Sequence, residues 1–353
     1  MSNFDLANLA LKAVCPNNEL IYDDKGLPSV MVKIPKMTYA QLGLGSSTAV
    51  HPAFIVNGVE KDAIYISKYQ NVVQNGRAYS LPGQDPRADI TFDAAFDACK
   101  AKGKGWHLMT RPEWALIALW CKANGTLPYG NNNFGKDARE SIYKGVPSMG
   151  AFGTNCRIAT GTGPLTWSHD RTPSGIWDLN GNVWEWVGNL RTVYGELQVL
   201  VNNNGADSSK DQSATSGEWK AISAADGSFI TPNGSGTTSG SIKMSWSSGL
   251  VYDTTVANAG THDCDFEAIT CSANISDAAK LVLQGLGLLK YDATSGAYEG
   301  DHVWFNSAEA ERSFYCGGHW SHGAGSGAFA LYGDGARSYS FWHFGFRSAY
   351  VPL

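Results

Sequence analysis

Charge, and positive charge above all, is scarce in this sequence. Only 17% of the 353 residues are charged, the net charge is −5, and lysine and arginine are scattered along the chain. A nucleic-acid-binding domain needs a basic patch or stripe, so we expect no nucleic-acid partner. Hydrophobic residues make up 43%, which is enough to bury a core and argues against a disordered chain.

Targeting and membrane signals are also missing. The N-terminus, MSNFDLANLALKAVCPNNEL, has no basic start followed by a long apolar run, and no stretch of 18 apolar residues occurs. We therefore expect no signal peptide and no membrane insertion. The chain is expected to be made in the cytoplasm, so a role outside the cell needs another carrier.

The cysteines lack the spacing of a disulfide framework or a zinc site. There are seven, an odd number, and no CxxC pair occurs. They are Cys15, Cys99, Cys121, Cys156, Cys264, Cys271 and Cys316. We expect free thiols in a reducing compartment.

Glycine (40), tyrosine (15) and tryptophan (12) are abundant, a mix typical of loops anchored by aromatic rings and not of a helix bundle. Apolar residues at helical spacing predict a helix over 91–103, with Thr91 as its N-cap. A second helix is predicted over 111–123, where Thr110 and Glu113 form a capping box.

Other segments are less regular. Residues 1 to about 28 are expected to form a short helical arm, and residues 276–284 a short helix. Residues 202–240 are rich in Asn, Gly, Ser, Thr and Asp and have too few apolar side chains for a packed element, so we expect long surface loops. Residues 313–353 are rich in glycine and aromatics and are interpreted as strands with exposed loops.

Four separated segments carry motifs: MVKIPKMTYAQLG through AIYISKYQNVV, WHLMTRPEWALIALWCKANGTLPYGNN, SGIWDLNGNVWEWVGNLR, and CGGHW…GFRSAY. In this order they resemble the opening strands, the second helix, the GLxDMxGNVWEW signature and the C-terminal strand pair of the formylglycine-generating-enzyme type of C-type lectin fold. The resemblance implies an α+β domain over 29–353 with long loop insertions, after an N-terminal arm over 1–28. The segment from about 196 to 300 has no counterpart in that family and is interpreted as an insertion.

The GNVWEW segment also has a physical logic of its own. Gly181 permits a turn that a Cβ would block. Trp184 and Trp186 are two residues apart, so on a strand they point to the same face. We expect both rings to be packed in the core.

Two enzymatic branches of the family depend on metals. Formylglycine-generating enzymes hold copper with two cysteines that follow the GGS motif, whereas residues 317–323 here read GGHWSHG and Cys316 stands alone. Thiolate ligation of copper needs at least two sulfurs, so we expect no such activity. A second branch uses histidines to hold iron. A metal-dependent oxidase or sulfoxide-synthase-like enzyme that uses His319, His322 or His343 is therefore the alternative.

Two further polar sets are weaker candidates. A catalytic group drawn from Ser321, Asp334 and the neighbouring histidines depends on geometry that a sequence does not give. His51, His107 and His169 are spread along the chain without ligand-like spacing. We expect them to be ordinary core or surface histidines.

A third branch resembled by this chain, the variable proteins of diversity-generating retroelements, is not enzymatic. Its template repeats are rich in AAC and AAT codons whose adenines are misread, so varied positions keep codons that end in a pyrimidine. Such codons cannot encode Lys, Glu, Gln or Met, and residues 317–344 contain none of these. The resemblance implies a variable, ligand-binding region at about 317–344.

Within this region a fixed frame alternates with positions expected to vary. The frame comprises Trp320 and residues 328–331, 336–338 and 345–349. Trp342 departs from the codon pattern because its codon ends in a purine, but it is retained in the ligand-binding set. The set is His319, Ser321, His322, Gly325, Ser326, Tyr332, Gly333, Asp334, Gly335, Tyr339, Phe341, Trp342, His343 and Phe344.

Four large rings stand in a row from Phe341 to Phe344. On a strand, successive side chains point to opposite faces, so these rings cannot all point into one core. Exposed aromatic clusters usually mark an interaction surface. Tyrosine, serine and glycine are also the residues that antibody loops use for contact.

The resemblance also implies a structural calcium ion at the GNVWEW loop; no other cofactor is expected. Its ligands would be the side chains of Asp178 and Glu185 and the carbonyls of Gly181 and Val183. Carboxylate and backbone oxygens suit such a hard cation. The other interpretation is a loop held by ordinary hydrogen bonds, with Asp178 capping the turn.

Together these observations predict a non-enzymatic binding protein diversified by a retroelement. Its partner is expected to be a protein or glycan receptor on a bacterial surface. The missing signal peptide suits a phage tail protein carried outside on the virion, through homo-oligomer or virion contacts. The alternatives are the histidine-metal enzyme and a structural virion protein.

Overall fold

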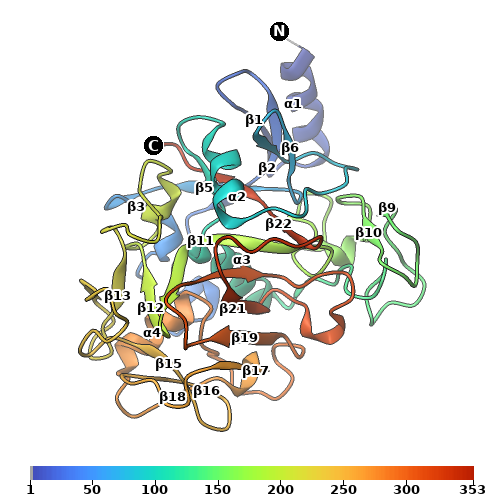
Figure 1. The fold of residues 1–353 in the computed structure, drawn as a ribbon. Coiled ribbons are helices and arrows are strands. Elements are labelled where there is room, and N and C mark those ends of the chain that lie inside the picture. Colours follow the sequence, from blue (N-terminus) through green and yellow to red (C-terminus); the bar gives the residue numbers. More distant parts are fainter. Residues whose placement is uncertain (1–2) are drawn as a thin grey trace.

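The computed structural model describes residues 3–353, so the first two residues of the expected arm lie outside the described part. Two sheets dominate the fold (Figure 1). The smaller sheet is antiparallel, in the order β1 (Asn18–Tyr22), β2 (Pro28–Pro35), β5 (Ala63–Ser67), β23 (Ser348–Tyr350) and β8 (Trp106–Leu108). The last strand of the chain therefore pairs with strands from its first third, which closes the domain.

The larger sheet contains most of the second half of the chain. Its main path runs β17 (Thr261–Asp265), β19 (His302–Asn306), β21 (Leu331–Gly335), β20 (Arg312–Cys316), β11 (Trp184–Val193), β12 (Glu196–Val199), β15 (Lys243–Trp246), β16 (Leu250–Asp253) and β18 (Thr270–Cys271). Three strands attach beside this path: β13 (Lys220–Ile222), β14 (Phe229–Ile230) and β22 (Phe344–Phe346). Three hairpins lie apart: β3 (Ile55–Val56) with β4 (Val59–Glu60), β6 (Val72–Gln74) with β7 (Arg77–Tyr79), and β9 (Pro147–Met149) with β10 (Arg157–Ile158).

β11, which begins inside the GNVWEW segment, is the central strand of the larger sheet. All ten of its residues are buried. It pairs antiparallel with β12 and β20 and parallel with β22. Trp184 and Trp186 lie in one buried aromatic cluster with Tyr315 and Phe344, so the prediction that both rings are core residues is confirmed.

The helices begin where their caps predict. In α2 (Phe92–Lys100), the Thr91 side chain accepts from a backbone N–H of the first turn. In α3 (Arg111–Asn124), Thr110 and Glu113 form the predicted capping box, and the chain leaves through Gly125 at φ 65°. α1 (Asn3–Val14) and α4 (Asp277–Gly285) complete the set, and the α+β architecture is confirmed.

The expectation that residues 202–240 form only surface loops is wrong. This segment carries β13 and β14, and Trp219, Ala221 and Ile222 are almost fully buried. Ile222 belongs to the main hydrophobic core, as do Leu197 and Met244 on the neighbouring strands β12 and β15. A short apolar strand between polar turns was hidden by the average composition. The yellow-to-orange segment in Figure 1 thus extends the same sheet and core.

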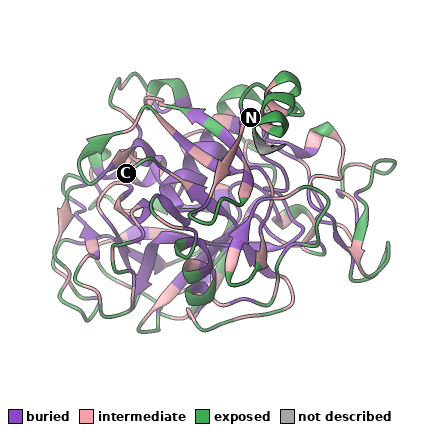
Figure 2. Ribbon diagram, turned by 90° about the horizontal axis from the view of Figure 1, so that it is seen from above, coloured by how far each residue is buried: buried purple, intermediate pink, exposed green. Residues whose placement is uncertain are grey.

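Two sequence expectations concern thiols and membranes. All seven cysteines lie in the described part of the chain and are free. None of the helices that the structure describes is long and apolar enough to cross a membrane. Figure 2 shows that α1 is largely exposed, and four of the five residues of β1, which packs against it, are only partly buried.

Candidate functional site

The floor of the candidate site is the ring of Trp184 at the start of β11. It is 2% exposed, and its centroid lies 4.4 Å from that of Tyr332 and 5.0 Å from that of Tyr315. The rings of His322 and His319 cover its outer side at 5.1 and 6.2 Å. The buried GNVWEW segment therefore supports the segment predicted to bind ligand.

Two glycines direct the chain from the core to the surface. After β20, Gly317 and Gly318 both adopt a positive φ, 92° and 91°, which side chains disfavour. A Cβ on Gly318 would lie 2.0 Å from the Ser326 hydroxyl oxygen, so the two arms of this loop touch. The chain then returns through β21 and, after a second loop, through β22.

Three predicted histidines form a stack on this floor. The ring centroids of His319 and His343 are 4.2 Å apart with an interplanar angle of 9°, and those of His319 and His322 are 5.5 Å apart at 19°. The Tyr332 hydroxyl joins the His322 Nε2 at 2.6 Å and the His302 Nδ1 at 3.2 Å. The stack therefore continues as a hydrogen-bonded chain towards β19.

Burial keeps these histidines neutral. Burial, together with the neighbouring histidines, lowers the pKa of His319 to about 2 and the pKa values of His322 and His343 to about 4. The rings therefore stack without charge repulsion at neutral pH. Burial also raises the pKa of Asp334, although the hydrogen bond from the Tyr315 hydroxyl, at 2.6 Å, opposes this shift.

The stacked geometry does not suit the alternative of a histidine-held metal. An imidazole lone pair lies in the plane of its ring, so parallel stacked rings direct their lone pairs past one another. Among residues 3–353, no group of three or more His, Cys, Asp or Glu side chains is arranged to hold a metal ion. The Ser321 hydroxyl lies 3.3 Å from the His319 Nδ1. Asp334, however, accepts a hydrogen bond from Tyr315 and is not paired with His319, so these residues do not form a Ser–His–Asp triad.

The outer face of the site is a run of partly exposed rings. Tyr339 is 45% exposed and Phe341 43% exposed. The ring centroid of Phe341 lies 5.0 Å from that of His343, and the ring centroid of Trp342 lies 4.6 Å from that of the fully buried Trp320. These rings therefore join the histidine stack to form one aromatic surface.

A charged cleft of about 310 Å³ borders this surface beside Trp342. Its walls include Asp85, Arg87 and Arg157. Arg157 donates to Asp85 at 2.6 Å and to the Trp342 carbonyl at 3.1 Å. The cleft offers polar contacts next to the rings.

The predicted set divides by exposure. Nine members reach the surface at least in part: His319, Ser321, His322, Gly325, Asp334, Tyr339, Phe341, Trp342 and His343. Five are buried: Ser326, Tyr332, Gly333, Gly335 and Phe344. The buried five lie beneath the surface, so their place in a varied, ligand-binding set stays a prediction.

Burial and ion pairs hold parts of the predicted frame in place. Residues 328–331 are all buried. The Arg337 guanidinium pairs with Asp93 at 2.7 Å and Glu311 at 2.9 Å, which fixes the second loop at its base. Phe346 is fully buried in the same cluster as Trp186. The loops thus rise from fixed ends.

Sequence reasoning missed three contributors from β17 and β19. Trp304 is 36% exposed and its ring centroid lies 5.7 Å from that of Tyr332. His302 bonds Tyr332 through one ring nitrogen and faces Asp263 at 3.2 Å through the other. These residues lie outside the recognised motifs, so only the parallel pairing of β19 with β21 brings them to the site.

Most of the expected calcium ligands do point to one position, but the side-chain amide of Gln70 occupies it. The Gln70 side-chain nitrogen lies 3.1 Å from the carbonyls of Asp178 and Val183, 3.4 Å from that of Gly181 and 3.0 Å from the Glu185 Oε1. Its oxygen accepts from Asn182 at 2.8 Å, which sets the amide orientation.

The carboxylates at this loop are also engaged elsewhere. The Arg347 guanidinium donates to both oxygens of Glu185 at 2.6 Å. The Asp178 carboxylate turns away and accepts from the Gly161 N–H at 2.9 Å. The Gln70 amide nitrogen, a buried donor, lies where the cation would lie, and Arg347 pairs with both oxygens of Glu185, so these residues as arranged do not fit calcium. The Asp178 Oδ1 is buried without a hydrogen-bond partner among the described residues.

The fold and site can now be compared with known proteins. The chain has a C-type lectin fold of the formylglycine-generating-enzyme type. A family model described as "Sulfatase-modifying factor enzyme 1-like domain" matches residues 49–245, more than half of the chain, and the chain belongs to this family. No curated protein sequence matches it.

Several solved structures are similar at low identity. They include PvdO from Pseudomonas aeruginosa (15% identity, TM-score 0.38, covering 94% of this chain and 97% of that one). The Major Tropism Determinant P3c variant has 13% identity and a TM-score of 0.31, over 91% of this chain and 62% of its own length. Treponema denticola variable protein 1 has 11% identity and a TM-score of 0.34, over 95% and 99%.

Exposed and buried members of the predicted set should differ in their tolerance of substitution. Ser321→Tyr and Phe341→Ser should change the free energy of unfolding by less than about 0.5 kcal/mol, because both positions face solvent. Phe344→Ser should cost about 3 kcal/mol or more. Gly333→Ser should cost about 1–3 kcal/mol, since its Cβ would lie 2.2 Å from the Phe314 ring. Urea titrations that gave equal losses for all four would contradict this division.

Calcium should have no effect on this protein. Chelator-treated protein should show no heat on calorimetric titration with calcium and no change in melting temperature, because Gln70 satisfies the loop. Gln70→Ala should lower the free energy of unfolding by at least about 2 kcal/mol, since several buried oxygens lose their donor. A calcium-dependent rise in the melting temperature of the unmodified protein would refute the assignment of this role to Gln70.

The histidine stack should contribute a pH dependence to stability. A pKa depressed in the folded state means that stability is complete above the unfolded value, near 6.5, and is lost as pH falls through about 4. His343→Phe keeps a ring but removes one titrating group. The unmodified protein should therefore lose more stability than this variant between pH 6.5 and pH 4. If the free energy of unfolding, from denaturant titrations, changed with pH equally in both proteins, His343 would not be buried as a neutral ring. The contributions of His51 and His169 are the same in both proteins and cancel in the comparison.

Proposed function

We propose that this chain is a non-enzymatic ligand-binding protein whose recognition surface is the outer face of residues 317–344, diversified by a retroelement. One observation carries the proposal: within this segment, frame residues 328–331 are buried and Arg337 is held by ion pairs, while the rings of Tyr339 and Phe341 lie at the surface. Phe341 and Tyr339 remain more than 40% exposed although Phe346, a few residues on, is fully buried.

The composition of this surface suits recognition of a large partner. Partly exposed aromatic rings supply rigid contact area at low entropic cost, and interface hot spots are enriched in Trp and Tyr. Ser321 and Gly325 beside them supply small, adaptable positions. The charged cleft at Asp85 and Arg157 adds polar contacts at the rim.

The proposed partner is a protein or glycan receptor on a bacterial surface, and the proposed setting is a phage tail. The α1 arm supports attachment to a larger assembly, since Leu6 and Leu9 on it are 55% and 58% exposed (Figure 2). Homo-oligomer contacts would use the same arm.

Binding to whole bacterial cells tests the surface directly. The fluorescently labelled full chain should bind cells of at least one species in a panel. Tyr339→Ser with Phe341→Ser should reduce that binding about tenfold or more, because aromatic anchors dominate interface energies. Tyr143→Ser with Phe152→Ser is the matched control, since this tyrosine and phenylalanine are also exposed but lie on the β9–β10 side.

Two results would contradict the proposal. One is equal binding by the surface variant and the control variant, which would place recognition elsewhere. The other is an absence of binding to every species in the panel, which would favour a structural virion role.

A further inference from the structure

The turn between β11 and β12 holds a tyrosine in an unfavourable backbone conformation. Tyr194 and Gly195 form a two-residue hairpin loop, with φ of 48° and 80°. Hairpins of this kind normally place Asn or Asp before the glycine, because a bulky residue resists positive φ. Strained residues of this kind cluster at functional sites.

The packing around Tyr194 holds its backbone but not its ring. Its N–H donates to the Glu309 carbonyl at 2.8 Å. A Cβ on Gly236 would lie 2.3 Å from the Val193 carbonyl and 2.8 Å from the Tyr194 Cβ, so the 235–240 loop presses against the turn. The ring itself is 44% exposed.

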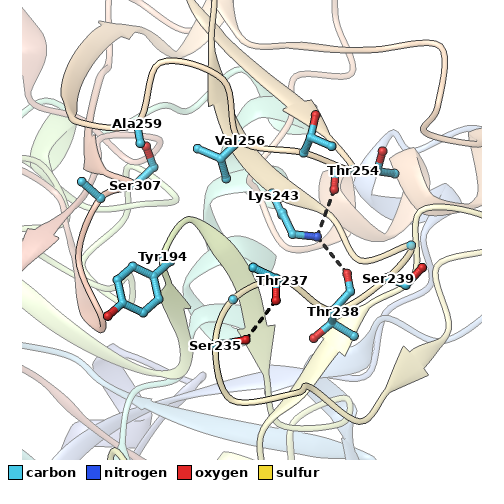
Figure 3. Close-up of a pocket in the computed structure, with 14 residues that line it drawn as sticks. Tyr194, Ser235, Thr237, Thr238, Ser239, Lys243, Thr254, Val256, Ala259 and Ser307 are labelled. Carbon is cyan, nitrogen blue, oxygen red and sulfur yellow. Dashed lines mark hydrogen bonds between the residues drawn. The ribbon is translucent and has the colours of Figure 1, made fainter.

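The ring borders a cavity of about 880 Å³ on the insertion (Figure 3). Apolar atoms make up most of its exposed wall, and hydroxyl groups stand among them; those of Ser235, Thr237, Ser239 and Thr255 belong to exposed residues. Figure 3 shows Val256 across the cavity from the Tyr194 ring. The cavity therefore combines an aromatic ring, a largely apolar wall and a set of hydroxyl donors and acceptors.

The cavity has almost no available charge. Lys243 is the single charged residue among those that line it. Its ammonium donates to the carbonyls of Thr238 and Thr254 at 2.9 and 3.0 Å (Figure 3). It also donates to the Ser241 hydroxyl at 2.7 Å, so all three of its protons are used. An anionic ligand would find no free cation here, and a cationic ligand would find no carboxylate.

We infer that this cavity is a second binding site, for a neutral saccharide. A pyranose ring presents an apolar C–H face that suits the exposed Tyr194 ring and hydroxyls that suit the serine and threonine wall. The site is independent of the proposed recognition surface, because none of its residues belongs to 317–344. It would give the protein a constant sugar contact separate from the surface proposed to vary.

A glycan array of neutral and acidic oligosaccharides, probed with the labelled full chain, tests this inference. The chain should bind neutral glycans in preference to acidic ones. Tyr194→Asn should weaken that binding by about tenfold or more. Asparagine tolerates positive φ better than tyrosine, so the variant should keep or raise the melting temperature, which separates loss of binding from loss of folding.

Two further variants locate the site. Tyr143→Asn, at an exposed tyrosine elsewhere, should bind like the unmodified protein. Tyr339→Ser with Phe341→Ser should keep the neutral-glycan binding even if it loses binding to cells. The inference is overturned if no neutral glycan binds, if acidic glycans are preferred, or if the binding depends on Tyr339 and Phe341 but not on Tyr194.

Discussion

The buried ion pair between Arg347 and Glu185 is the interaction on which the rest of the structure depends. The guanidinium donates to both carboxylate oxygens and also to the backbone carbonyls of Ser67 and Trp177. One side chain thus joins the smaller sheet to the central strand of the larger one. Breaking such a pair by removing one partner costs about 3–5 kcal/mol, because the other charge stays buried. Because Arg347 directly follows β22, it also fixes one end of the segment 317–344.

Much of the fold was predictable because its signals are local. The Thr110–Glu113 capping box marks the start of α3 through hydrogen bonds within one turn. The GNVWEW segment predicts its own strand and buried face through the spacing of Trp184 and Trp186. The buried positions within residues 202–240 were not predictable in the same way. Trp219 and Ile222 occupy a few core positions within a polar stretch, and their burial depends on pairing with strands distant in sequence.

The sequence predicted which segment forms the site, but not which of its residues are exposed and which are buried. The absence of Lys, Glu, Gln and Met indicated residues 317–344 as the variable segment. It could not distinguish exposed Phe341 from buried Phe344, because their exposure depends on how β22 pairs with β11. The calcium prediction is not supported for a similar reason. The ligand motif is present, but Gln70, more than a hundred residues earlier in the chain, supplies a donor at the position where a cation would lie.

The central proposal is that a retroelement varies the surface residues of 317–344 while the frame residues stay the same. The DNA around the gene tests it most directly. The account predicts a reverse transcriptase gene and a near-copy of the codons for 317–344. That copy should differ from the gene only at adenines, at surface positions such as His319, Tyr339 and Phe341, and should match it over 328–331. A neighbourhood with neither a reverse transcriptase nor a near-copy, or differences concentrated in the buried frame, would contradict it.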